Sequence, residues 1–198
     1  MSETEAHGKC MGRLESTIAG NRVVHKLIES INELGCSIPK DFFVCRKCDY
    51  DMTGGFLLPQ YSSSEKGKFL SSPSQYEPKI VLCEDKNIDR TTFDNTIIHE
   101  LVHAYDVCRA KIDFKNCSNH ACTEIRASAL SGECAMTREV QRGQLNIRGG
   151  HRACVKRRAG LSLASNEYCQ DSCSSDVEAA LDQCYNDKSP FDGPRGLL

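Results

Sequence analysis

Residues 92–109 constrain the fold of this chain more than any other stretch. Apolar residues recur there at the spacing of one face of an α-helix: Ile97, Ile98, Leu101, Tyr105 and Cys108. Thr91 or Thr92 is a suitable N-cap for this helix. On another face, His99 and His103 stand one turn apart, so both imidazoles project toward the same point. Two nitrogen ligands in that arrangement suit a tetrahedral zinc ion, so the sequence predicts a zinc site on this helix.

Glu100, which follows the first histidine, completes the pattern His-Glu-x-x-His. On a helix this pattern is typical of zinc peptidases, in which the glutamate holds a water molecule at the metal and takes its proton. Two ordinary surface histidines near a carboxylate are the alternative interpretation, because so short a motif also occurs by chance. The context favours zinc, since one side of the helix is apolar and another carries all three polar groups.

Two histidines and a water molecule leave one protein ligand to be found. In a metzincin the motif would continue with Gly at 106 and His at 109, but this chain has Asp106 and Arg109, which excludes that class. The other common arrangement takes a Glu from the next helix, and Glu124 lies far enough beyond His103 for a loop and a return. Asp106 and His120 stay open as alternative third ligands. We expect Asp106 rather to orient an imidazole or to pair with Arg109.

Peptide hydrolysis is the chemistry that such a site supports. Zinc polarises the peptide carbonyl and lowers the pKa of water toward neutrality, while Glu100 accepts the proton and passes it to the leaving amine. A hydrogen-bond donor or a positive group should stabilise the oxyanion. His151, His120 and Tyr105 are candidates for this role, and the sequence does not rank them.

Thirteen cysteines in 198 residues indicate the compartment in which the chain folds. They are scattered, and only Cys45-x-x-Cys48 has the spacing of a zinc-finger pair, so we expect a disulfide framework formed under oxidising conditions. The first twenty residues lack a signal-peptide core, and no apolar run is long enough to span a membrane. The mitochondrial intermembrane space fits, because oxidative folding can trap proteins there. A net charge of −2 does not indicate a nucleic-acid partner.

Two short clusters have more than one interpretation. Cys45-x-x-Cys48 could be a redox centre, half of a zinc site, or two cysteines in structural disulfides, and we favour the disulfides because a thioredoxin-like βαβ context is lacking. Lys156-Arg157-Arg158 could touch anionic lipid, although a solvated charge cluster is the simpler interpretation.

The pattern along the chain predicts an α+β fold. We expect a flexible N-terminal arm over residues 1–20 and a single domain over 21–198, which begins with an amphipathic helix over 21–34. Two short strands should follow within residues 36–58. A Ser-rich stretch at about 60–77 then predicts a flexible surface loop.

Residues 79–84 have the best strand pattern in the chain, and they lead into the helix at 92–109. We expect an edge strand over the catalytic cleft, to which a substrate backbone could add. Helices are expected in the C-terminal part over about 120–130, 133–145 and 175–185. The predicted architecture is a compact, disulfide-rich, zincin-like domain with a small sheet packed on the metal-binding helix and a helical C-terminal part.

Residues 35–191, roughly four-fifths of the chain, resemble the mitochondrial inner-membrane metalloprotease family that also serves in ATP synthase assembly. The landmarks of this resemblance are Gly54-Gly55-Phe56, Ile80-Val81-Leu82-Cys83, His99-Glu100-Leu101-Val102-His103-Ala104-Tyr105-Asp106 with Cys108-Arg109, Ala121-Cys122 with Glu124 and Arg126-Ala127, Leu130-Ser131-Gly132 with Cys134, Cys154-Val155 with Arg158-Ala159, and Cys184 through Asn186-Asp187 to Pro190-Phe191. One departure is the stretch 60–77, which many family members replace by a tighter connection.

The resemblance implies a zinc metalloendopeptidase of the intermembrane space that is folded by the disulfide relay during import and contacts the inner membrane peripherally. It would process the precursor of the mitochondrially encoded proton-channel subunit of ATP synthase and assist assembly of that enzyme. Assembly need not require proteolysis, so a non-catalytic assembly chaperone on a protease scaffold is the alternative function. An intact Glu100 favours the enzyme, because a chaperone has no need of it. A redox-active dithiol protein is a third hypothesis.

Overall fold

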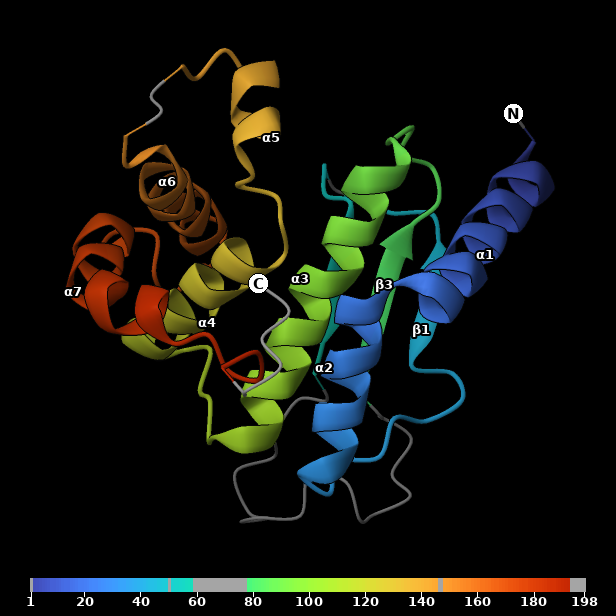
Figure 1. Ribbon diagram of the computed structural model, residues 1–198, viewed down its shortest axis with the longest axis horizontal. Helices are drawn as coiled ribbons and strands as arrows, with labels where there is room; N and C mark the ends of the chain where they lie inside the picture. Colours follow the sequence, from blue (N-terminus) through green and yellow to red (C-terminus); the bar gives the residue numbers. More distant parts are fainter. Residues whose placement is uncertain (1, 50, 59–77, 146–147, 193–198) are drawn as a thin grey trace. The chain divides into compact units, whose positions relative to one another are not determined.

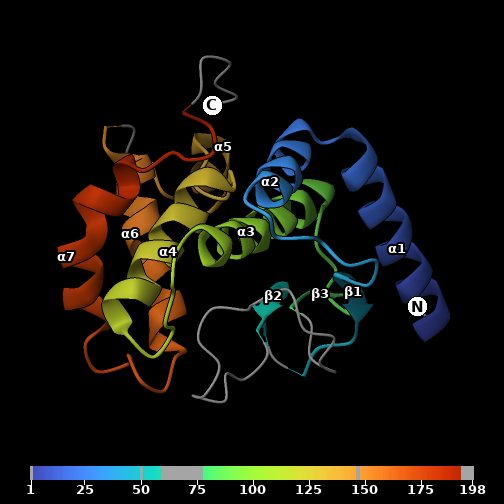
Figure 2. The same cartoon turned by 90° about the horizontal axis from the view of Figure 1, so that it is seen from below.

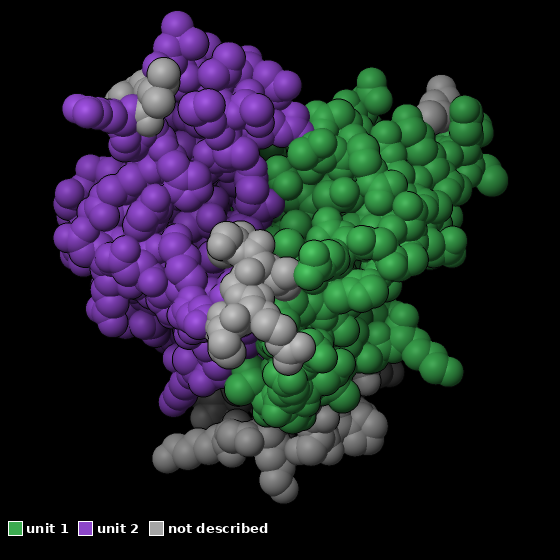
Figure 3. Space-filling view, in the orientation of Figure 1, with its two compact units in different colours: residues 1–104 green, residues 105–198 purple. Residues whose placement is uncertain are grey.

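A computed structural model describes residues 2–49, 51–58, 78–145 and 148–192 (Figure 1). The chain divides into two compact units, residues 1–104 and 105–198 (Figure 3). The boundary falls inside helix α3, Arg90–Arg109, so one continuous helix contributes to both units. This division does not test the expected single domain over 21–198, which stays a prediction. The loop expected at 60–77 lies outside the described residues.

The first unit begins with two helices, α1 at Glu3–Gly20 and α2 at Arg22–Glu33. Asn21 separates them, because its side chain accepts hydrogen bonds from the first backbone N–H groups of α2 and so caps that helix. The helix over residues 21–34 is therefore confirmed. Where the sequence predicts a flexible arm, the structure has α1 instead. The physical reason lies in Cys10, which is buried and forms a disulfide with Cys45.

A sheet of three strands follows, with β1 at Phe43–Arg46, β2 at Gly54–Leu57 and β3 at Lys79–Cys83. The order is β1-β3-β2, in which β3 runs parallel to β1 and antiparallel to β2. The two strands expected within 36–58 are confirmed. The expectation that residues 79–84 form an edge strand is wrong, because β3 pairs on both sides and lies at the centre. A substrate backbone could not add to a strand paired in this way.

Helix α3 lies between α2 and the sheet over the part of its length that belongs to the first unit (Figures 1 and 2). The Thr96 hydroxyl lies 2.9 Å from that of Thr53, which precedes β2. Gly54 permits this close approach, since a Cβ at that position would lie 2.7 Å from Thr96 Cγ2 and 2.8 Å from the Val81 carbonyl oxygen. The N-cap is Asp89 rather than Thr91 or Thr92, because the Asp89 carboxylate accepts from the Thr92 N–H at 2.8 Å.

The second unit is helical, with α4 at Cys117–Leu130, α5 at Met136–Gln141, α6 at Gly150–Ala164 and α7 at Cys173–Asn186. Helix α4 packs against both α6 and α7. Disulfides within this unit join the helices to one another and to their connecting turns: Cys117–Cys169, Cys122–Cys184 and Cys134–Cys154. Helix α5 is shorter than the expected range 133–145, because its C-terminal end is followed by Gly143, whose φ of +76° is left-handed.

The α+β prediction, with its small sheet on the metal-binding helix and its helical C-terminal part, is confirmed. Disulfides run through both units, as the cysteine content predicts: Cys48–Cys83 is the second bond of the first unit, and Cys36 and Cys108 are disulfide-bonded as well. Cys173 is the free cysteine. Within the part of the chain that the structure describes, we find no helix with the length and apolar character needed to cross a membrane.

Candidate metal centre

Helix α3 brings the two motif histidines together as its periodicity predicts. The ring centroids of His99 and His103 lie 4.8 Å apart, with the ring planes at 76°. His103 is buried and His99 is half-buried. Glu100 is also buried, and it is rotated by about 100° around the helix from His99 because an α-helix has 3.6 residues per turn. The three polar groups of the motif therefore lie on adjacent parts of one mostly buried helix.

Asp106 lies on the histidine face, one turn beyond His103, and its carboxylate is buried with 2% exposure. It accepts hydrogen bonds from Arg109 Nε at 2.9 Å, from Thr123 Oγ1 at 3.0 Å and from Arg126 Nε at 3.0 Å. The expected pairing with Arg109 is confirmed. Thr123 and Arg126 belong to α4, so this carboxylate joins α4 to the last turn of α3 within the second unit.

Arg126 is the counter-charge of this cluster, and its side chain is only 1% exposed. It donates through Nη1 to the Asp187 backbone oxygen, and through Nη2 to the Ser189 backbone oxygen at 2.6 Å. Burying a guanidinium costs free energy unless its N–H groups form hydrogen bonds. Here they donate to three acceptors: the Asp106 carboxylate and the backbone oxygens of Asp187 and Ser189. Asp187 is bound by Arg109 as well, at 2.6 Å. The segment after α7 is thereby fixed on α4.

Electrostatics favour the ionised form of Asp187. Burial alone would raise the pKa of its carboxyl, but the hydrogen bond from Arg109 and the charge of Arg126 lower the pKa below its ordinary value. Asp106 and Asp187 together neutralise the two arginines. The sequence marked Arg126 and Asp187 only as landmarks of the family resemblance and indicated no role for either.

Glu124 lies on α4 between Thr123 and Arg126, the two residues of this helix that bind Asp106. It is buried, and its Oε1 lies 3.3 Å from His120 Nε2. One potential ligand atom from each of His99, His103 and Glu124 lies within 4.8 Å of the other two. Among the described residues, this is the group of His, Cys, Asp or Glu side chains that could hold a metal ion, and neither Asp106 nor His120 belongs to it.

The donor set fits zinc. Two imidazole nitrogens and a carboxylate oxygen are the three protein ligands of many catalytic zinc sites. With bonds of about 2.0–2.2 Å, a tetrahedral ion would separate its ligand atoms by roughly 3.4 Å. The candidate ligand atoms lie within 4.8 Å of one another, which is close to that spacing. The arrangement can therefore hold a divalent cation.

Of the three oxyanion candidates, Tyr105 lies on the buried apolar face of α3 and not on the histidine face. The Arg109 guanidinium lies 5.4 Å from its ring centroid, and burial raises the pKa of its hydroxyl. His151 bonds to the Tyr185 hydroxyl at 2.8 Å through Nδ1, and burial lowers the pKa of its imidazole. His120 bonds to Glu124. The role of oxyanion donor stays unassigned among the predicted residues.

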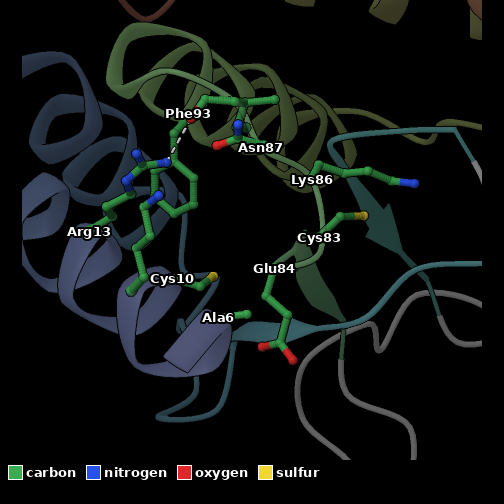
Figure 4. Close-up of a pocket in the computed structure, with 10 residues that line it drawn as sticks. Ala6, Cys10, Arg13, Cys83, Glu84, Lys86, Asn87 and Phe93 are labelled. Atoms are coloured by element: carbon green, nitrogen blue, oxygen red, sulfur yellow. Dashed lines mark hydrogen bonds between the residues drawn. The ribbon is translucent and has the colours of Figure 1, made fainter. Parts of the chain in front are cut away.

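The Cys45-x-x-Cys48 pair is structural. Cys45 is bonded to Cys10 and Cys48 to Cys83, so the two cysteines form neither a redox dithiol nor a zinc half-site. A pocket near these disulfides is lined by Arg13, Glu84 and Phe93, among others (Figure 4). Two of its charged groups have partners within the protein: Arg13 donates to the Ile88 carbonyl oxygen at 2.8 Å, and Glu84 contacts His7 at 2.7 Å.

The basic run at 156–158 is also paired. Lys156 contacts Glu178, Arg157 contacts Glu139 at 2.9 Å, and Arg158 contacts Glu133 at 2.8 Å. These ion pairs agree with a surface charge cluster, the simpler of its two interpretations.

Comparisons with known proteins assign this chain to a family. The Peptidase M76 family matches residues 8–192. The mitochondrial inner membrane protease ATP23 of Yarrowia lipolytica is 34% identical over 92% of this chain and 67% of its own length. The human homologue is 34% identical over 92% of this chain and 69% of its own length, and the Schizosaccharomyces pombe protein is 35% identical over 86% and 84%. No solved structure matches the chain. The chain belongs to the Peptidase M76 family, and it is a metallopeptidase.

Proposed function

We propose that this protein is a zinc metalloendopeptidase in which His99, His103 and Glu124 hold the metal and Glu100 is the general base. The observation that carries the proposal is the convergence of one ligand atom from each of these two histidines and Glu124. Membership of a metallopeptidase family supports it. Bound zinc would supply a Lewis acid that polarises the scissile carbonyl and acidifies water.

Glu100 and Asp106 carry out the steps that the metal does not. Glu100 takes a proton from the attacking water at its carboxylate and delivers the proton to the nitrogen of the leaving amine. Its burial keeps bulk water away from this carboxylate, which strengthens its hydrogen bonds to the reacting groups. Asp106 holds α4 on the metal helix and so positions Glu124.

We further propose that the substrate is the precursor of a mitochondrially encoded membrane subunit of ATP synthase, and that the protein assists assembly of that enzyme. The relatives are named as mitochondrial inner membrane proteases, which supports a substrate in that membrane. Disulfides in both units support folding in an oxidising compartment, for which we propose the intermembrane space, entry by the disulfide relay and peripheral contact with the inner membrane.

A non-catalytic assembly chaperone is the second candidate, and a Glu100→Gln variant separates the two. Because glutamine keeps the size of the side chain and removes its basicity, the variant should fold, bind zinc and fail to cleave the precursor. Assembly of ATP synthase in cells that carry the variant then shows whether the two roles are separable. Normal cleavage by Glu100→Gln would refute the proposed base.

A further inference from the structure

The side chain of Asn166 has only one orientation that satisfies its neighbours. Its Oδ1 accepts the backbone N–H of Tyr168 at 3.0 Å, and its Nδ2 donates to the Phe114 carbonyl oxygen at 2.8 Å. A flipped amide would place an oxygen against a carbonyl and an NH₂ group against an N–H. The positions of the amide oxygen and nitrogen follow from these two backbone partners.

This orientation determines the tautomer of His120. The second hydrogen of Asn166 Nδ2 points at His120 Nδ1, 2.8 Å away, so that nitrogen must accept. In a neutral imidazole the other nitrogen then carries the hydrogen. That nitrogen, His120 Nε2, lies 3.3 Å from Glu124 Oε1. His120 is therefore a hydrogen-bond donor to the carboxylate of the proposed metal ligand.

The surrounding structure fixes the hydrogen bonds from Asn166 to His120 and from His120 to Glu124. Cys117, one turn before His120 on α4, is bonded to Cys169, and the backbone N–H of Cys169 donates to the Asn166 carbonyl oxygen at 2.9 Å. The Phe114 ring packs edge-on against the imidazole, with centroids 5.3 Å apart. The side chains of His120 and Glu124 are 12% and 8% exposed, so water competes little for the bond between them.

We propose that His120, held in its Nε2–H tautomer by Asn166, is the positioning residue that sets the rotation of the Glu124 carboxylate toward the metal. The inference rests on the proposed function, since it needs Glu124 as a ligand. His120 is not itself a metal ligand in this account, because both ring nitrogens are engaged, one with Asn166 and one with Glu124. Partners of this kind typically raise metal affinity by about 10–100-fold.

Zinc affinity, measured on the full-length protein by competition with a chromophoric chelator, tests the inference. His120→Leu removes the donor at similar volume and should weaken zinc binding by about 10–100-fold. His120→Gln offers an amide donor in its place and should recover most of that loss. His151→Leu is the matched control, because it removes another half-buried histidine of the same unit and should leave zinc affinity unchanged. Thermal unfolding of each variant without metal verifies that it folds.

A double-variant cycle separates positioning from a general structural role. If His120 acts through Glu124, then His120→Leu has no further effect on zinc affinity once Glu124 has become Gln. An equal loss in both backgrounds overturns the proposal, as does unchanged zinc affinity in His120→Leu. Wild-type zinc affinity in Glu124→Gln alone would refute the proposed ligand set instead, so the two failures are distinguishable. The d–d absorption of the cobalt-substituted protein should shift in His120→Leu, because the carboxylate turns.

Discussion

The two parts of helix α3 are held by different kinds of interaction. In the first unit, Ile97 and Leu101 are fully buried on a helix that lies between α2 and the sheet (Figure 2). In the second unit, the last turn of the helix is fixed by the Asp106 carboxylate and its partners Arg109 and Arg126. Apolar packing tolerates small changes in shape at moderate cost, whereas a buried charge cluster depends on each partner being present.

This difference assigns separate tasks to the two parts. Apolar packing of α3 stabilises the fold around the two histidines. The Asp106 cluster defines where α4, and with it Glu124, stands relative to the last turn of α3. Variants of the apolar residues in the first part should therefore lower stability without changing the metal site of the folded molecule. Variants in the second part should change both the stability and the metal site.

The largest effect is expected at Asp106. Asp106→Leu removes one of the two carboxylates that pair with the buried Arg126, which should lower the free energy of unfolding by about 3–5 kcal/mol and weaken zinc binding. Chemical denaturation of the metal-free protein and chelator competition measure the two effects. In the double variant Asp106→Leu, Arg126→Met both charges are gone, and part of the lost stability should return. No recovery in the double variant would mean that the pair does not act as a unit.

A smaller effect is expected in the apolar part of the helix. Leu101→Ala leaves a cavity beneath α3 and should lower the free energy of unfolding by about 3 kcal/mol. The folded fraction should bind zinc with wild-type affinity, because Leu101 lies on the face opposite the carboxylate cluster. A loss of zinc affinity as large as that of Asp106→Leu would remove the distinction between the two parts of the helix.

The smallest effect is expected in the pH dependence of stability. Because Arg109 and Arg126 lower the pKa of Asp187, its carboxylate contributes stability above its ordinary pKa of 3.8, and this contribution is lost as pH falls through the lower pKa of the folded state. Asp187→Asn should therefore be less stable than the wild type near about pH 7, and the difference should disappear once the pH is below the lowered pKa of the folded state. Unfolding midpoints measured across this range give the comparison. A difference that grows toward acid would have the wrong sign.

Most of the correct structural predictions came from local periodicity in the sequence. Helix α2, helix α3 and the pairing of Asp106 with Arg109 depend on residues a few positions apart, so they are visible in the sequence. Glu124 was chosen as ligand because zinc sites of this kind commonly take a glutamate from the next helix, and this choice stays a proposal.

Contacts between residues far apart in the sequence were not predicted. The central position of β3 depends on pairing with β1 and β2, which alternation of residues does not encode. Helix α1 has a polar, acidic sequence, and the disulfide that anchors it was not deducible from one sequence. Asn166 lies in the turn between α6 and α7, where nothing in its neighbours points to His120. Each of these misses concerns a partner more than twenty residues away.

The central claim is that two imidazoles of α3 and one carboxylate of α4 converge on a single zinc ion. X-ray absorption at the zinc edge, on stoichiometrically loaded protein, tests this claim most directly. The account predicts two imidazole nitrogens and a carboxylate oxygen at about 2.0–2.2 Å, with the carboxylate contribution lost in Glu124→Gln. An identical zinc environment in the wild type and in Glu124→Gln would contradict it.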